Sequence, residues 1–597
     1  MKKVERCIPV CTNSPHAQRG GLFCHVIEQP AQRAQASRPK AVVPYVTTLA
    51  RVKGIAYAEH SPGGTYMAKR VDLDAMIPRE DFAIAQETYV LDLIKDFPIT
   101  HLTNESPVLK LLRKPDFQRE TNHWNPDQVV SLLASFLDGE VIPSLILWKA
   151  PRYIFVIDGG HRLSALRAWM LDDYGDGAAS LSFYKGEIST RQKDIAKHTR
   201  RLIEKHVGRY STLHSQVDTK NAPEEIARRA QVLFTRALPL QWIQGDASVA
   251  ETSFFKINSQ GTPLDDTETL LIKNRKKPIA IAARAILRAG SGHKYWSKFP
   301  PVCAADVESV TLEFHDKIFK PEAEEPLKTL ELPLGGSVSP VDALALLIDF
   351  LAIAGTREND SKAIDKYADD DVGDDTVKVL KNALQVLNRI AGNNAASLGL
   401  HPAVYFYNEK GKYSRFLFLG MTAVIQDKLR NNNSTFFKLF TTARKELEQF
   451  LLDNKSVIGL ILQNLSKGQR VPKVRELFEF LVSKFQIHET VTIEDAIANL
   501  GIRGRILDAN VVQTAPHISD DTKSMVYVRQ AVTSALRCPV CGGLLDPSKS
   551  VSYDHIEPRR AGGTGDHLNV QLAHPYCNTG YKESQAAAAE KANQKSD

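Results

Sequence analysis

The 597-residue sequence lacks any apolar run long enough to cross a bilayer, and residues 1–30 hold charges and prolines instead of an apolar segment. The first absence excludes a membrane-spanning helix, and the second gives no sign of a signal peptide. Cysteine is scarce too, with seven residues, three of them close together near the C-terminus. This sparse usage suits a reducing compartment, so we expect a cytoplasmic protein.

A strong charge of one sign is also lacking. The net charge of +7 is modest for this length, so nucleic-acid binding would depend on a local basic surface. The 43% hydrophobic and 24% charged residues are typical of a soluble globular protein. The length predicts two to four domains, and no repeat period holds along the chain.

The most informative stretch of the sequence runs from Cys538 to Lys582. Cys538 and Cys541 form one pair with a two-residue gap, and His574 and Cys577 form a second. Such a gap lets both side chains of a pair reach one ion, so the four residues predict a tetrahedral Cys3His zinc site. Because so short a segment has little core of its own, the ion would drive its folding.

Four further residues of this stretch are suited to phosphodiester hydrolysis: Asp554, His555, Asn569 and Asn578. A carboxylate and an amide oxygen suit a hard cation such as Mg²⁺. An imidazole can deprotonate water, and a neighbouring amide carbonyl can hold its tautomer. The alternative is a zinc knuckle that only binds nucleic acid or a partner, but such a knuckle has no need of these four residues.

The order and spacing of these residues, with the Gly562-Gly563 turn, resemble the McrA-like HNH endonucleases, which have a ββα-metal fold. The resemblance implies that Asp554 and Asn578 bind the catalytic Mg²⁺ or Mn²⁺. It also implies that His555 is the general base and that Asn569 orients it.

The stretch departs from the family pattern at three positions. His574 stands where the family usually has a third zinc cysteine, and Asn578 stands where many members have their last histidine. Lys582 lies one residue later than in the usual Cys-Asn-x-x-Lys ending, which leaves its role open.

A second motif lies in the N-terminal half, where the apolar run Tyr153–Ile157 leads into Asp158-Gly159-Gly160-His161-Arg162 and then a helical pattern. Two glycines let backbone N–H groups approach a phosphate at a helix N-terminus. Arg162 can bind phosphate oxygens, and Asp158 can hold a metal or orient water. Taken alone, the pentapeptide equally fits a tight turn with a solvent-facing arginine.

The context of this motif adds a resemblance. Phe117-Gln118-Arg119 precedes Trp124, and Asn258 precedes Gly261 by three positions. Over residues 100–275 this series resembles the ParB-like domain of GmrSD-type restriction proteins, which implies binding of a nucleoside triphosphate. The residues that the resemblance assigns to the nucleotide are Gln118, Arg119, Asp158, Gly159, His161, Arg162, Asn258 and Gly261. Gly160 stands where the family has Gln, so hydrolysis, as distinct from binding, is left open.

The rest of the chain divides by composition. Residues 1–65 form an irregular extension whose scattered cysteines we interpret as free thiols, and residues 585–597 form a polar tail. Apolar periodicity predicts strands at 108–112, 142–148 and 153–157 and helices at 126–137, 278–289, 340–354, 376–391, 436–452, 456–465, 472–485 and 493–500. An aromatic cluster between Tyr405 and Phe416, with nearby Lys and Arg residues, fits either core packing or a base-stacking site.

The sequence therefore predicts a multidomain α+β protein. A ParB-like α/β domain (66–278) precedes a helical linker domain (279–530) and a ββα-metal HNH module (531–584) with a structural zinc. The expected function is a nucleotide-regulated, metal-dependent DNA endonuclease of the modification-dependent or antiviral restriction type. A homo-oligomer is one way for its single HNH site to cut both strands. The alternative is a ParB-like, nucleotide-switched DNA-binding regulator with a zinc knuckle and no cleavage.

Overall fold

A computed structural model describes residues 70–82, 94–116, 118, 121–216, 223–260, 266–336, 340–356, 363–501 and 517–586. The predicted extension over residues 1–65 lies outside this part of the chain, and so does most of the predicted tail. Arg119 and Gly261 also fall outside it, and the side chain of Asn258 is not described.

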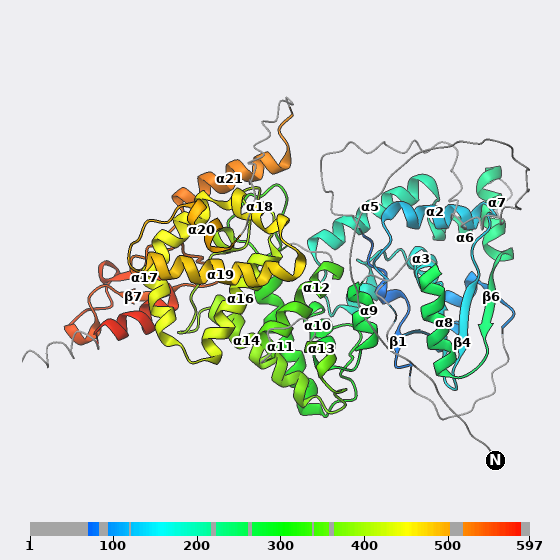
Figure 1. Cartoon of the computed structure of the whole chain (residues 1–597). Coiled ribbons are helices and arrows are strands. Elements are labelled where there is room, and N and C mark those ends of the chain that lie inside the picture. Colours follow the sequence, from blue (N-terminus) through cyan, green and yellow to red (C-terminus); the bar gives the residue numbers. More distant parts are fainter. Residues whose placement is uncertain are drawn as a thin grey trace, which may run out of the picture. The chain divides into compact units, whose positions relative to one another are not determined.

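The N-terminal region is a six-stranded mixed sheet with helices (Figure 1). The strands are β1 Arg79–Glu80, β2 Asp96–Pro98, β3 Leu112–Pro115, β4 Leu145–Lys149, β5 Ile154–Asp158 and β6 Ala237–Ile243. Their order is β1-β3-β5-β4-β6-β2, with β4 antiparallel to β5, β2 antiparallel to β6, and the other pairs parallel. The helices of this region are α1 Pro107–Leu111, α2 Pro126–Leu137, α3 Gly160–Leu171, α4 Ala178–Phe183, α5 Thr190–His206, α6 Tyr210–Ser215, α7 Glu224–Thr235, α8 Ala247–Gln260 and α9 Asp266–Lys273.

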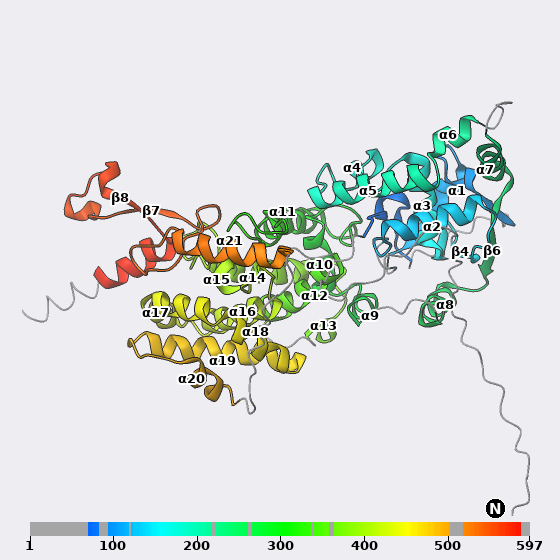
Figure 2. The same cartoon turned by 90° about the horizontal axis from the view of Figure 1, so that it is seen from above.

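The sheet is covered on both faces because its central strands are apolar on both sides. In β5, Val156 belongs to one hydrophobic core with residues of α2, α3 and α5, whereas Phe155 and Ile157 belong to a second core with residues of α8. Figure 2 shows α2, α3 and α5 on one side of the strands and α8 on the other. A continuous apolar run such as Ile154–Ile157 is what a strand buried on both faces requires. This arrangement confirms the predicted α/β region.

One predicted strand is wrong in place and type. Residues 107–111 form α1, and the strand β3 begins only at Leu112. Pro107 stands at the first helical turn, where its fixed φ and missing N–H favour a helix start, and this local signal outweighs the apolar run that follows.

The middle of the chain is helical, as predicted, and shares one large hydrophobic core. Its helices are α10 Pro278–Leu287, α11 Pro301–Phe319, α12 Pro340–Phe350, α13 Ala363–Lys366, α14 Asp374–Ile390, α15 Pro402–Tyr405, α16 Arg415–Arg430, α17 Ser434–Asp453, α18 Lys455–Asn464, α19 Lys467–Phe485, α20 Ile493–Asn499 and α21 Asp520–Ser534. The helix expected to start at Pro472 begins five residues earlier, because Ser466 and Gln469 form a capping box. None of the described helices is both long and apolar enough to cross a membrane.

The C-terminal module is a short hairpin followed by a helical segment. Strands β7 Ser552–His555 and β8 Val570–Ala573 pair antiparallel, with Asp554 opposite Gln571. The segment η6, Cys577–Tyr581, is π-helical and continues as α-helix to residue 586. This ββα order is the fold expected of the module.

The module is tied to the helical region by buried polar contacts. Glu448 Oε2 on α17 accepts the Leu544 N–H at 2.7 Å, and the Tyr576 N–H donates to the Ser397 carbonyl at 2.9 Å. A Cβ on Gly399 would lie 2.7 Å from the ring of His574, so only glycine permits this close approach. The helical region therefore supports the module directly at its Cys/His cluster.

Candidate active site

The four predicted zinc ligands come together where the two knuckles meet. Cys538, Cys541, His574 and Cys577 are buried, and their ligand atoms all lie within 4.8 Å of one another. The Cys538 knuckle is closed by the Gly542 N–H, which donates to the Cys538 carbonyl at 2.8 Å. Three thiols and one imidazole at this spacing are a donor set that fits Zn²⁺.

The orientation of His574 also fits a metal ligand. Its Nε2 lies 2.9 Å from the Leu544 carbonyl, which can only accept, so Nε2 carries the ring proton. The other nitrogen, Nδ1, faces Cys541 Sγ at 3.3 Å. Burial, aided by the guanidinium of Arg444, lowers the pKa of His574 and favours the neutral ring that a metal needs.

Asp554 lies on β7 with its carboxylate buried and partly used. Lys582 Nζ donates to its two oxygens at 2.8 and 2.9 Å, and Gln571 Nε2 donates to Oδ2 at 2.9 Å. A carboxylate offers roughly four acceptor positions, so one remains for a further ligand. Gln571 and Lys582 hold this carboxylate in place, and the predicted metal site did not include them.

The π-helical segment η6 explains the displaced lysine. The Lys582 N–H bonds to the Cys577 carbonyl, five residues back, where an α-helix would use the residue four back. A π-turn absorbs one additional residue without ending the helix. Lys582 therefore reaches Asp554 although it lies one position later than the family pattern has it.

Asn578, at the start of η6, has an unambiguous amide orientation. Its Nδ2 donates to the Tyr553 carbonyl at 3.1 Å and to Ser552 Oγ at 2.7 Å. Because a carbonyl can only accept, the amide nitrogen faces β7 and Oδ1 faces away. Among the described residues none donates to this oxygen, and an amide oxygen beside the residue preceding Asp554 is a suitable ligand for a hard cation.

His555 follows Asp554 at the end of β7 and is half exposed. Arg559 Nε donates to its Nε2 at 3.3 Å, so Nε2 is the unprotonated nitrogen of the ring. The backbone of His555 is fixed as well, because its carbonyl accepts from Lys582 Nζ at 2.8 Å.

Asn569 closes the loop between β7 and β8. Its Oδ1 accepts the Glu557 N–H at 2.8 Å, and its Nδ2 donates to the carbonyls of Glu557 and Thr564. Its backbone carbonyl accepts the Ile556 N–H at 2.9 Å. The sequence resemblance predicts that Asn569 orients the His555 ring directly. The described contacts give Asn569 an indirect hold on His555, through the backbone that follows it.

In the N-terminal region, Gly159 makes the turn between β5 and α3. Its φ is +101°, and a Cβ there would lie 2.4 Å from Leu145 Cδ2, so the turn requires glycine on both counts. Helix α3 has no side-chain N-cap. No N-cap side chain therefore competes with an anion for the backbone N–H groups at this turn, although both glycines are buried.

Two of the predicted nucleotide residues bind each other. Arg162 Nη2 donates to Asp158 Oδ2 at 2.7 Å and to the Ser144 carbonyl at 3.2 Å. The Asp158 side chain is 39% exposed, whereas that of Arg162 is 13% exposed. Arg162 thus stabilises the turn from inside, which differs from the solvent-facing arginine of the simpler interpretation.

Gln118 lies against the glycine that replaces the family's Gln. A Cβ on Gly160 would be 3.4 Å from Gln118 Oε1, an ordinary contact, so the Gln118 amide lies beside the space left by the missing side chain. Its Nε2 donates weakly to the Ile157 carbonyl at 3.4 Å. Its buried Oε1 has no donor among the described residues.

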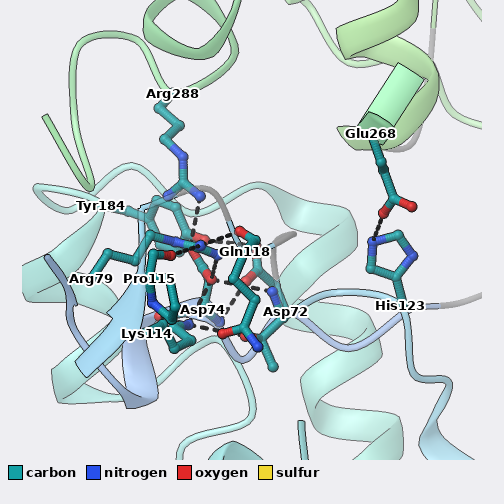
Figure 3. A network of polar contacts seen from close by, with 11 residues as sticks. Asp72, Asp74, Arg79, Lys114, Pro115, Gln118, His123, Tyr184, Glu268 and Arg288 are labelled. Carbon is teal, nitrogen blue, oxygen red and sulfur yellow. Dashed lines mark hydrogen bonds and ion pairs between the residues drawn. The ribbon is translucent and has the colours of Figure 1, made fainter. Parts of the chain in front are cut away.

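Aromatic rings and an acid surround His161. Its ring stacks on Trp124 with centroids 5.6 Å apart, and the ring of His123 lies 6.0 Å away. His123 Nε2 is 3.0 Å from Glu268 Oε1 on α9 (Figure 3). The chain segments carrying the Gln118 and Asp158 motifs and α9 are thus gathered at one place.

A buried charge network that we did not predict lies beside these residues (Figure 3). Asp74 is 1% exposed and accepts from Arg79 and Lys114, each at 2.7 Å, and from Arg288 at 2.6 Å. Burial alone would raise the pKa of Asp74, but the three cations outweigh it and hold that pKa well below its ordinary value. One residue of the sequence could have indicated this network: Lys114 lies in a short strand whose other buried positions are apolar.

Comparison with known families agrees with the geometry of the N-terminal region and with that of the C-terminal module. Residues 99–275 match the GmrSD restriction endonuclease N-terminal domain, and residues 538–584 match the HNH endonucleases. The chain thus carries an HNH endonuclease domain, and its reaction is the hydrolysis of DNA phosphodiester bonds. More particularly, the chain joins a GmrSD-type N-terminal domain to this C-terminal HNH domain, a combination that supports a restriction-type DNA endonuclease. No curated protein and no solved structure matches the chain significantly.

Proposed function

We propose that the C-terminal module cuts DNA with His555 as general base and with a divalent cation, Mg²⁺ or Mn²⁺, on Asp554 and Asn578. The orientation of Asn578 carries this proposal, because its Nδ2 is held by the carbonyl of Tyr553, the residue before Asp554, and its Oδ1 has no donor among the described residues. When bound, the cation supplies positive charge that stabilises the phosphorane and the leaving oxygen. The Cys3His cluster holds a structural Zn²⁺ in this proposal.

The proton chemistry falls to His555. Water attacks the phosphorus atom, its proton passes to Nε2 of His555, and the bond from phosphorus to the leaving sugar oxygen breaks. Nε2 is the unprotonated nitrogen, but Arg559 donates to it. An incoming phosphate is a stronger, charged acceptor for that guanidinium, so DNA binding would draw Arg559 away and free the base.

The N-terminal domain is proposed to bind a nucleoside triphosphate that regulates the nuclease. The uncapped start of α3 and the unpaired Oε1 of Gln118 support binding. The Asp158–Arg162 pair and Gly160 do not favour hydrolysis, because the two charged groups satisfy each other. We therefore propose a nucleotide that is sensed without being consumed.

Metal dependence is tested by titrating Mg²⁺ into a nicking assay on supercoiled plasmid, using the wild type and Asn578→Ala. The variant should need at least tenfold more Mg²⁺, as expected when a metal ligand is lost. An unchanged Mg²⁺ requirement would remove Asn578 from the metal site. Nicked circles should precede linear product, because one HNH site cuts one strand.

Nucleotide binding is tested separately by calorimetry with ATP, GTP, CTP and UTP on the wild type and Gln118→Ala. Loss of one binding event in the variant, together with nucleotide-dependent cleavage by the wild type, is the expected result. An equal cleavage rate with and without each of the four nucleotides would mean that the Asp158 turn has only a structural role. No specific observation favours the non-cleaving regulator.

A further inference from the structure

The helical region contains a cavity of about 320 Å³ that belongs to neither of the sites above. It lies where α15, α16 and α18 meet the first turns of α19, and its walls include Tyr405, Tyr407, Tyr413 and Phe416. Its floor is buried at Tyr405 and Ile458, and its rim reaches the surface at Gln463. This size lies at the lower end of small-ligand pockets.

The three tyrosines of the cavity differ in how their hydroxyl groups are satisfied. The Tyr405 hydroxyl lies 3.0 Å from Glu448 Oε1, and the Tyr407 hydroxyl donates to the Pro333 carbonyl at 2.8 Å. The Tyr413 hydroxyl is equally buried but has no partner among the described residues. An unpaired buried hydroxyl costs about 1–3 kcal/mol, so a fold gains nothing by keeping one unless a ligand uses it.

The charges around the cavity are of one sign. Lys455, Arg415 and Arg470 line it, and none of the described residues that line it is acidic. Lys455 Nζ donates to the carbonyls of Ala403, Val404 and Tyr407, and burial lowers its pKa to about 7, so it contributes only part of a charge near neutral pH and no free donor. Arg415 pairs with Asp349, but its buried Nε has no partner among the described residues.

The ligand chemistry follows from these groups. Burial raises the pKa of Tyr413 well above its ordinary value, so its hydroxyl stays protonated and can donate to a ligand acceptor. Aromatic walls favour a flat ring, and Arg470, whose guanidinium lies 4.8 Å above the Phe416 ring, supplies positive charge near the rim. A nucleotide has these features, because it joins a flat base with acceptor atoms to an anionic phosphate.

We propose that this cavity binds one nucleotide, with its base against the aromatic walls, an acceptor of the base on the Tyr413 hydroxyl and its phosphate toward Arg470. The nucleotide is either free or turned out of a DNA strand. The site is separate from the Asp158 turn and from the nuclease centre, so it neither needs nor duplicates the regulation proposed above.

Two variants test the cavity without touching either other site. Gly459 on α18 lines it, and a Cβ there meets no atom within 4 Å, so Gly459→Leu should fill the space without a clash. Gly468 near the start of α19 is equally open but does not line the cavity, so Gly468→Leu is the matched control. Tyr413→Phe removes only the unpaired hydroxyl and should leave the melting temperature unchanged or raised.

Binding is measured by calorimetry with the four deoxynucleoside monophosphates, a 12-nucleotide single strand and a duplex with one unpaired base. The protein carries His555→Ala, so that DNA stays intact, and Gln118→Ala, so that the Asp158 turn does not contribute. Gly459→Leu should weaken binding at least tenfold and Tyr413→Phe about three- to tenfold, with Gly468→Leu unchanged.

The ligands in this measurement distinguish a free nucleotide from a base turned out of DNA. Monophosphate binding that Gly459→Leu abolishes supports a free nucleotide as the ligand, and loss confined to the strand or the unpaired base supports a turned-out base. Absence of binding in all arms, or binding that ignores both cavity variants, overturns the proposal. Neither outcome affects the nuclease assignment, which depends on His555 and Asn578.

Discussion

Asp74 illustrates how single residues stabilise this protein. It neutralises Arg79 and Lys114 from the sheet region and Arg288 from just beyond α10, and all four side chains are buried. Buried charges without partners are costly, so one carboxylate keeps three cations in the folded state. Because Asp74 lies between the sheet region and α10, its replacement should destabilise both.

Replacing this carboxylate should be strongly destabilising. We expect Asp74→Asn to lower the free energy of unfolding by about 3–5 kcal/mol, because three buried cations lose their counter-charge. Urea denaturation checks this, with Asp566→Asn, on an exposed loop, as control. A loss within 0.5 kcal/mol, the usual effect of a surface change, would contradict the account.

The same residue predicts an acid dependence. The folded pKa of Asp74 lies below the ordinary value of 3.8, so its contribution is complete above about pH 4 and is lost as the pH falls through the folded pKa. Between pH 5 and 2, the free energy of unfolding should fall more steeply with decreasing pH in the wild type than in Asp74→Asn. Parallel curves would show that Asp74 does not titrate with folding.

Lys582 should compete with the catalytic cation, because both need the Asp554 carboxylate. We expect Lys582→Met to lower the Mg²⁺ concentration for half-maximal nicking by about tenfold, equivalent to about 1.4 kcal/mol. A higher Mg²⁺ requirement would mean instead that the lysine orients Asp554 for the metal.

Arg559 is expected to bind a phosphate when DNA arrives. Arg559→Ala should weaken DNA binding and reduce the salt dependence of the affinity by about one counter-ion, which a titration at several salt concentrations measures. Arg560, the next residue, pairs with Glu583 at 3.7 Å and provides Arg560→Ala as a comparison. An unaltered salt slope would confine Arg559 to its contact with His555.

The residues that carried motifs were predictable, and those that complete them were not. The spacing of Cys538, Cys541, His574 and Cys577 was sufficient because a single ion constrains it. Gln571 and Arg559 escaped prediction because their roles depend on strand pairing and loop path, which spacing does not encode. Asp74 and Arg288 lie 214 positions apart, so only the fold brings them together.

At the scale of elements, η6 shows how a helix accommodates an additional residue. Deleting Gly580 should convert the π-turn to a regular α-helix, restore the family spacing and leave Lys582 on Asp554 with nicking largely retained. Inserting one alanine after Gly580 should turn Lys582 by about 100° and abolish the contact. Equal activity of the two variants in a nicking assay would separate Lys582 from the site.

Most helices and the central strands were predictable from apolar periodicity, as α2 and β5 illustrate. The segment 107–111 was not, because an apolar run of that length suits either structure and Pro107 decides it. The pairing order of the six strands also lay beyond the sequence, since the paired residues Phe97 of β2 and Leu238 of β6 are 238 − 97 = 141 positions apart. Such long-range pairing follows from the packed faces of the sheet.

At the scale of the whole molecule, the nuclease module depends on α17 as much as on its zinc. Glu448 is fully buried and accepts from Leu544, Tyr405 and Arg444. Glu448→Gln should lower the melting temperature, speed zinc loss to a chelator and slow nicking together. The same values as wild type in all three measurements would contradict this coupling.

The central claim is that the HNH site cuts DNA with His555 as its base, and supercoiled-plasmid cleavage tests it most directly. Wild type and His555→Ala are compared in Mg²⁺, with zinc content and melting temperature measured on the same preparations. The account predicts nicking by the wild type and a loss of at least 100-fold in the variant, the usual scale of general-base catalysis, with zinc and stability unchanged. Undiminished cutting by His555→Ala would contradict it.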